Sequence, residues 1–154
     1  MHDISHNISH NISHYLTADH HHCDDLFADA ENAVATDDWP AAMTQFESFA
    51  AATLLHFTRE ESILFPAFEE RTGMGHGPTA IMRGEHVEMR ETLQGMEQAL
   101  TEQDADAYLG LAETMLMLLR QHNMKEEQIL YPMADQALAD GASVMVREME
   151  ALTA

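Results

Sequence analysis

Apolar residues recur at helical spacing along the first half of the chain. From Tyr15 onward they form a stripe that ends around residues 36–38, which predicts a first helix. A second stripe begins near Pro40, a residue suited to the first turn of a helix, and runs to about Glu70. Pro66 is expected to kink or shorten this second helix, because it removes a backbone hydrogen bond. The apolar positions of the two stripes are Leu16, Leu26, Phe27, Ala30, Val34, Phe46, Phe49, Leu54, Leu55 and Phe57.

Two further helices are predicted in the second half. Segment 73–78 holds three glycines and a proline, so we expect a loop with the third helix starting at its end. Asp104 is suited to cap the fourth helix, and Gly141 is placed to end it. A short tail helix is predicted over about 143–152. The apolar positions of the third and fourth helices are Met82, Val87, Met89, Leu93, Met96, Tyr108, Leu111, Met115, Leu118 and Leu119.

Four long helices with short connections and no convincing strand pattern predict an all-α fold. The natural architecture is an up-and-down four-helix bundle with a short C-terminal helix. A chain of 154 residues is one domain in length. We therefore assign residues 15–154 to the bundle and residues 1–14 to a repetitive, histidine-rich leader.

The leader consists of near copies of one four-residue unit, Ser-His-Asn-Ile. Its histidines at positions 2, 6, 10 and 14 would drift only slowly around a helix, so they form either an additional metal-binding stripe or a plain extension of the first helix. The extension is the favoured interpretation.

Composition excludes several classes of partner. Seven lysines and arginines against 27 acidic residues give a formal charge of −20, which repels nucleic acid and anionic membrane surfaces. No apolar stretch is long enough for a bilayer span, and the N-terminus has no export signal. The single cysteine, Cys23, agrees with a reducing compartment, so we expect a cytoplasmic protein, monomeric or homodimeric.

The strongest chemical signal is an internal repeat of the pattern His-x-x-x-Glu-Glu-x-Ile-Leu-aromatic-Pro, which occurs at 56–66 and at 122–132. Residues four apart on a helix lie on one face, so each copy directs an imidazole and a carboxylate at one point. Two such copies on facing helices supply what a bridged dinuclear metal centre requires. A single pair of this kind would be an ordinary helix-surface neighbour, but the repetition beside apolar segments favours the metal site.

Each copy has two adjacent glutamates. The fourth residue after the histidine is rotated by only about 40° on a helix and the fifth by about 140°, so Glu60 and Glu126 are the better ligands. Glu61 and Glu127 are left as surface charges, as hydrogen-bond acceptors behind the ligands, or as substitutes if a helix carries a local bulge.

The first and third helices are expected to complete the site. His20 is selected from the run Asp19–Asp24 by its helical phase, since His21 and His22 face elsewhere. His86 is the single histidine in the body of the third helix. Imidazole and carboxylate without thiolate suit iron, manganese or zinc. The candidate ligands are His20, His56, Glu60, His86, His122 and Glu126.

In the order and spacing of these residues, from Thr17-Ala18-Asp19-His20 to His122 and Glu126, the chain resembles the hemerythrin-like, or HHE cation-binding, proteins. The resemblance implies two iron ions, joined by an oxo or hydroxo bridge and by the two carboxylates. It assigns the histidines of the first two helices to one iron and those of the last two to the other. Met82 occupies the place of a further histidine that oxygen-carrying hemerythrins have, so one iron loses a ligand here.

With four histidines and two glutamates, the set looks more like the di-iron proteins that take part in repairing iron–sulfur centres damaged by nitric oxide or peroxide. We therefore expect a non-haem di-iron protein that binds or reduces dioxygen, nitric oxide or peroxide, together with an unidentified redox partner. The alternatives are an oxygen- or iron-binding or sensing module without catalysis, and a metal-free helical interaction protein. Cys23 is expected to be a small buried residue. Tyr15 and Tyr131 are expected to be either packing residues or hydrogen-bond donors to a bound oxygen.

Overall fold

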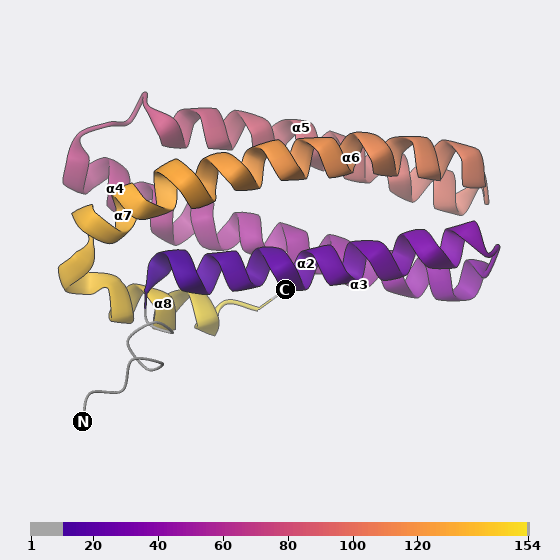
Figure 1. The fold of residues 1–154 in the computed structure, drawn as a ribbon, viewed down its shortest axis with the longest axis horizontal. Helices are drawn as coiled ribbons and strands as arrows, with labels where there is room; N and C mark the ends of the chain where they lie inside the picture. Colours follow the sequence, from indigo (N-terminus) through magenta and orange to yellow (C-terminus); the bar gives the residue numbers. More distant parts are fainter. Residues whose placement is uncertain (1–10, 154) are drawn as a thin grey trace.

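The computed structural model describes residues 11–153, and these are helical apart from short connections. No strand occurs within this range. Figure 1 shows long helical rods lying side by side, with the shorter helix α8 (Ala142–Ala151) running along their side near one end. The elements are α2 (Ile12–Ala35), α3 (Trp39–Arg59), η1 (Glu60–Leu64), α4 (Phe65–Thr72), α5 (Pro78–Thr101), α6 (Ala105–Lys125), η2 (Glu126–Leu130), α7 (Tyr131–Ala137), η3 (Ala139–Gly141) and α8 (Ala142–Ala151).

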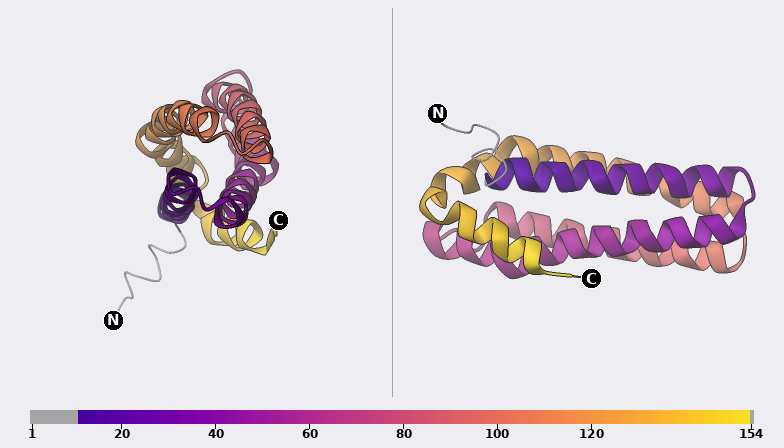
Figure 2. Two further views of the ribbon diagram at one scale, coloured as in Figure 1. Left: turned by 90° about the vertical axis from the view of Figure 1, so that its right-hand side faces the viewer. Right: turned by 90° about the horizontal axis from the view of Figure 1, so that it is seen from below.

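The long helices pack as two hairpins. Helix α2 packs mainly on α3, and α5 packs mainly on α6; further contacts join α2 to α6 and α3 to α5. The end-on view in Figure 2 shows these four rods around a common axis, with α8 on the outside. The prediction of an all-α helical bundle is confirmed, as are the predicted loop after Thr72 and the short C-terminal helix.

The two hairpins turn in the same way. Asp38 and Asp104 each precede a helix, and each side chain accepts a hydrogen bond from the backbone N–H three residues on. The residues just before them, Asp37 and Gln103, have positive φ angles of 56° and 52°. The predicted cap at Asp104 is confirmed, and Pro40 lies in the first turn of α3 as expected.

Pro66 does not end the second rod, which continues to Thr72. Five residues of π-helix, η1, precede α4, and Pro66 lies in the first turn of α4. A π-helical turn is wider than an α-helical one and can absorb a missing backbone donor. The fourth rod repeats this arrangement at η2 and α7, where Pro132 takes the same place.

Two apolar clusters fill the interior of the bundle. One, toward the hairpin turns, contains Phe27, Phe46, Phe49 and their neighbours. The other, at the opposite end, is built around Phe65 and Phe68. The buried polar residues lie mainly at the levels between these clusters. Of the apolar positions assigned to the third helix, Val87 is exposed, because it lies away from the face that the methionines bury.

Helix α8 packs on the side of the bundle, near one end, against α2 and η1. The Arg59 side chain fixes it by donating from Nε to the backbone oxygen of Met149, at 2.9 Å. Most of the predicted leader, residues 1–10, lies outside the described residues. Within the part of the chain that the structure describes, no helix has the length and apolar character needed to cross a membrane.

Candidate metal centre

The six side chains predicted to bind metal lie together between the two apolar clusters. The histidines come from α2, α3, α5 and α6, and the glutamates are the first residues of η1 and η2. None of the six is more than 4 % exposed, so their donor atoms are shielded from water. The six are His20, His56, Glu60, His86, His122 and Glu126.

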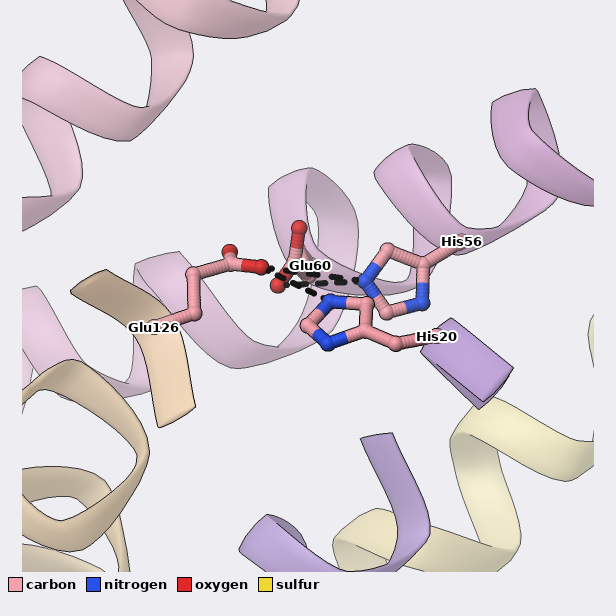
Figure 3. A group of neighbouring side chains, drawn as sticks. All are labelled: His20, His56, Glu60 and Glu126. Atoms are coloured by element: carbon pink, nitrogen blue, oxygen red, sulfur yellow. Dashed lines mark hydrogen bonds and ion pairs between the residues drawn. The ribbon is translucent and has the colours of Figure 1, made fainter. Parts of the chain in front are cut away.

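Their donor atoms form two sets, and within each set all four atoms lie within 4.8 Å of one another. The first position is the set drawn in Figure 3, which consists of His20, His56, Glu60 and Glu126. The second position consists of Glu60, His86, His122 and Glu126. Both glutamates belong to both positions, and the histidines divide between them as the family resemblance implied.

The Nε2 atoms of the histidines face the two glutamates. In the second position, Nε2 of His86 lies 3.1 Å from Oε1 of Glu60, and Nε2 of His122 lies 3.2 Å from Oε1 of Glu126. In the first position, Nε2 of His20 lies 3.0 Å from Oε1 of Glu126. The same carboxylate oxygen thus lies within reach of a histidine of each position, as a bridging group requires.

The outer nitrogen, Nδ1, of each first-position histidine lies against a carboxylate of a neighbouring element. Nδ1 of His20 is 2.6 Å from Glu127 Oε2, and Nδ1 of His56 is 2.8 Å from Asp19 Oδ2. A carboxylate in this place fixes the orientation and tautomer of the imidazole and raises its basicity as a ligand.

The second position is supported in the same way. Nδ1 of His86 is 2.6 Å from Glu61 Oε2, and Nδ1 of His122 is 2.8 Å from Glu85 Oε1. Of the roles left open for the second glutamate of each repeat, the structure gives that of a hydrogen-bond partner to a histidine. All four supporting carboxylates are neighbours in sequence of a candidate ligand.

Basic side chains contact three of the four supporting carboxylates in turn. Arg59 Nη1 donates to Asp19 at 3.1 Å, and Lys125 donates to Glu85. Arg90 forms a bidentate ion pair with Glu61, donating from Nη1 to Oε2 at 2.8 Å and from Nη2 to Oε1 at 2.9 Å. The chain has few basic residues, and these three lie at the centre's outer shell, where they offset part of its negative charge.

The unpaired atoms of the cluster fit a metal ion. Buried polar atoms normally have hydrogen-bond partners, so those without one require an explanation. Four of the six such side-chain atoms in residues 11–153 belong to the candidate ligands. They are Glu60 Oε1, His86 Nε2, His122 Nε2 and Glu126 Oε2. Nitrogen and oxygen donors that converge without partners are what a first-row transition metal completes.

The imidazoles and carboxylates of the cluster shift one another's pKa values in opposite directions. Burial works to lower the pKa of His122, but the charge of Glu126, whose Oε1 lies 3.2 Å from Nε2, raises it to about 9. Burial works to raise the pKa of Glu126, but the charge of His122 and hydrogen bonds from its neighbours hold that pKa well below its usual range. The cluster is thus arranged around paired charges, and a bound cation would take the place of the imidazole proton.

Tyr131 also reaches the centre. Its hydroxyl oxygen lies 2.7 Å from Oε2 of Glu60 and 2.9 Å from Oε1 of Glu126, and it donates its hydrogen to this pair. It also lies 3.2 Å and 3.3 Å from Nε2 of His20 and His56. Burial, together with the charges of the two glutamates, raises the pKa of Tyr131 well above 10, so the phenol keeps its proton. The sequence left this residue as a packing residue or as a donor to a bound oxygen; in the structure its hydroxyl donates to the two glutamates instead.

Aromatic rings enclose the second position. Phe57 stacks on His86 with ring centroids 4.0 Å apart and an interplanar angle of 17°. Phe65 lies on His86 as well, at 5.7 Å and 23°. These contacts fix the imidazole and keep water from that part of the centre.

A small cavity adjoins the first position. Its lining includes His20, His56, Cys23, Thr53 and Leu119, and its volume is about 10 Å³, roughly what one water molecule needs. The Thr53 hydroxyl is buried and has no hydrogen-bond partner. A molecule of two or three atoms bound at this position would meet apolar surface and one available hydroxyl.

Sequence reasoning did not assign a supporting role to Asp19 or Glu85, and for Glu61 and Glu127 this role was one of three alternatives. A signal for the carboxylates was present, because an acid–histidine pair occurs at 19–20 and again at 85–86. The spacing between these pairs, 66 positions, equals that between His56 and His122. The equal spacing indicates that the whole site, and not only its longer motif, is repeated.

Comparison with known proteins gives one match. A family model described as "Hemerythrin HHE cation binding domain" matches residues 11–134, which include every residue of the centre. No curated protein and no solved structure matches the chain.

Proposed function

The chain belongs to the hemerythrin HHE cation-binding family, and from this premise we propose that it is a non-haem di-iron protein that binds or reduces a small oxidant. The proposed ligands are the six side chains of the two positions, carried by four long helices in up-and-down order. The observation that supports this most directly is the convergence of buried nitrogen and oxygen donors into two sets that share both glutamates.

Iron is the proposed metal because the resemblance to the family implies it; imidazole and carboxylate donors without a thiolate suit iron, manganese or zinc and therefore agree with it. Each position offers two protein nitrogens and two shared carboxylate oxygens. Iron in such a site has coordination positions left for a small ligand and can exchange electrons with it.

The chain's own residues would hold the centre rigid and dry. Asp19, Glu61, Glu85 and Glu127 orient the imidazoles, while the rings of Phe57 and Phe65 exclude water from the second position. The small cavity beside His20 and His56, about the size of one water molecule, is where dioxygen, nitric oxide or peroxide would approach the first position.

We propose reaction rather than reversible carriage of the oxidant. Met82 is buried one turn before His86, in the place where oxygen carriers of this family have a further histidine. With one strong ligand fewer, the second ion is more open to change in its coordination. A role in the nitrosative or oxidative stress response, including repair of iron–sulfur centres, follows from this proposal.

The test is the metal content of the purified protein beside its Glu60→Ala and His122→Ala variants. His21→Ala is the matched control, because His21 is exposed and adjoins a candidate ligand in sequence. We expect about two iron ions per chain in the wild type and the control, and a clear loss in the other two.

Optical spectra before and after exposure to air complete the test. Rapid, irreversible oxidation of the reduced protein supports the proposed reaction, whereas a stable and reversible oxygen adduct would refute it in favour of a carrier. Iron content unaffected by Glu60→Ala and His122→Ala would show that the repeated pairs are structural.

A further inference from the structure

The two positions differ in how their donor atoms are hydrogen-bonded. In the first position, the Tyr131 hydroxyl lies between all four residues. It contacts Glu60 Oε2 at 2.7 Å and Glu126 Oε1 at 2.9 Å, and the Nε2 atoms of His20 and His56 at 3.2 and 3.3 Å. Every residue of the first position therefore presents an atom to this phenol.

The donors of the second position have no such partner. Nε2 of His86 and Nε2 of His122 are buried without a hydrogen bond of good geometry. Their nearest acceptors are glutamates of the same position: Glu60 Oε1 at 3.1 Å from His86, and Glu126 Oε1 at 3.2 Å from His122. The residue that corresponds to Tyr131 in the first copy of the repeat is Phe65. Its ring lies on His86, and it has no hydroxyl to offer.

We propose that the centre loads its two metal ions in a fixed order, the second position before the first, and that the Tyr131 hydroxyl sets this order. An ion at the first position competes with the phenol for Glu60 Oε2 and Glu126 Oε1. An ion at the second position replaces only the ion-pair contacts that its own histidines and glutamates make with one another, and no contact with the phenol is lost. This inference rests on the proposed metal site and adds a difference between its halves.

The size of the difference follows from the bonds that must be given up. A hydrogen bond to a charged group contributes enough that losing one weakens binding by about tenfold, and Tyr131 contacts two carboxylates. We therefore expect the first position to bind its ion at least about tenfold more weakly than the second. The more weakly held ion is also the one beside the small cavity.

The order can be observed directly by titrating the full chain, freed of metal with a chelator, with Zn²⁺ and recording ¹⁵N histidine NMR spectra. Zinc accepts imidazole and carboxylate ligands and has no redox chemistry to complicate the result. At one equivalent, we expect Nε2 of His86 and His122 to move to metal-bound shifts. His20 and His56 should follow only with the second equivalent.

Tyr131→Phe isolates the hydroxyl, since it keeps the ring in the apolar cluster. In this variant, we expect the two dissociation constants to approach each other by about tenfold or more, through tighter binding at the first position. The double variant Tyr131→Phe with Phe65→Tyr moves the hydroxyl to the other copy of the repeat, and it is expected to reverse the order in the NMR titration.

Three results would overturn the proposal: His20 and His56 responding first, all four histidines of the wild type responding together, or a ratio of the two dissociation constants that Tyr131→Phe leaves unchanged. Failure of the underlying metal site would look different, because none of the four histidines would then respond to Zn²⁺ at all. Circular dichroism of the variants checks that the bundle is retained.

Discussion

The Asp19 carboxylate lies 2.8 Å from Nδ1 of His56, and Asp19 immediately precedes His20 in α2. One turn of α2 therefore supplies a candidate ligand and also the group that orients the candidate ligand of α3. Burial works to raise the pKa of Asp19, but the hydrogen bond and charge of His56, together with Arg59, hold it below its ordinary value. The carboxylate is thus ionised at neutral pH and ready to support the imidazole.

Asp19→Asn is expected to weaken metal binding at the first position by about 10- to 100-fold, the usual effect of removing a group that orients a metal-binding histidine. Competition with a chromophoric chelator measures the affinity. Asp25→Asn is the matched control, since Asp25 is exposed on the same helix. Equal affinities in the two variants would contradict the assigned role of Asp19.

Phe49→Ala is expected to lower the free energy of unfolding by about 3–5 kcal/mol. Phe49 is fully buried and meets Phe27 edge-on at 5.3 Å, so its removal leaves a cavity in the larger apolar cluster. The measurement is urea denaturation at fixed metal loading, because a bound ion adds its own stabilisation. Val87→Ala, at an exposed position, should stay within about 0.5 kcal/mol of the wild type.

Glu69 links α4 to the start of α5, accepting hydrogen bonds from Thr79 Oγ1 at 2.6 Å and from Arg83. Burial works to raise the pKa of Glu69, but these bonds and the Arg83 charge lower it from 4.5. A carboxyl whose pKa is lower in the folded state than in the unfolded state stabilises the fold at any pH above the unfolded-state pKa. This stabilisation is lost as the pH falls through the folded-state pKa.

Glu69→Gln is therefore expected to lower the free energy of unfolding at pH 7 by less than about 1 kcal/mol, because the ion pair is partly exposed. The difference from the wild type should vanish at a pH below the folded pKa of Glu69. Urea midpoints along an acid series measure this, with the exposed neighbour Glu70→Gln as control. A difference that persists undiminished in acid would rule out the ionised carboxylate as its source.

Cys23 is expected to resist thiol reagents in the native protein. It is 7 % exposed, and burial raises its pKa to about 11, so only about one thiol in a thousand is ionised at pH 8. Labelling with a chromogenic disulfide at pH 8 should be slow, and it should become complete on addition of urea. Complete labelling within minutes without denaturant would show that the thiol is accessible and reactive.

The placement of the six candidate ligands follows from helical phase. His56 and Glu60 share a face because they are one turn apart. That face points inward because the residues around it, such as Phe49 and Leu64, are apolar. The same reasoning selected His20 over its two neighbours, which are exposed. Sequence was sufficient here because the spacing along each helix fixes the direction of the side chains.

The roles of Glu61 and Glu127 did not follow from phase. On a regular helix the fifth residue is turned about 140° from the histidine. The structure instead widens each helix into a π segment that begins at Glu60 and Glu126. The second glutamate of each pair then meets a histidine of another helix. A π segment depends on packing against neighbouring helices, which periodicity does not record.

The different roles of Tyr131 and Phe65 also lay beyond the sequence. Both occupy the aromatic place of the repeat, and aromatic residues in bundles mostly pack. The contact between the Tyr131 hydroxyl and Glu60, a residue 71 positions earlier, depends on how the fourth helical segment is shifted along its axis relative to the second. Such registers between helices arise from the whole core and not from any local motif.

Helix α8 lies beyond residue 134, where the family match ends. Its backbone at Met149 accepts a hydrogen bond from Arg59, whose guanidinium also holds the carboxylate behind His56. The C-terminal segment is therefore mechanically connected to the metal centre through one arginine and one aspartate. A tag, fusion or deletion at this end of the chain is therefore expected to disturb the contacts of Arg59 and Asp19 that support His56. Spectra of the metal-loaded protein would record this change at the first position.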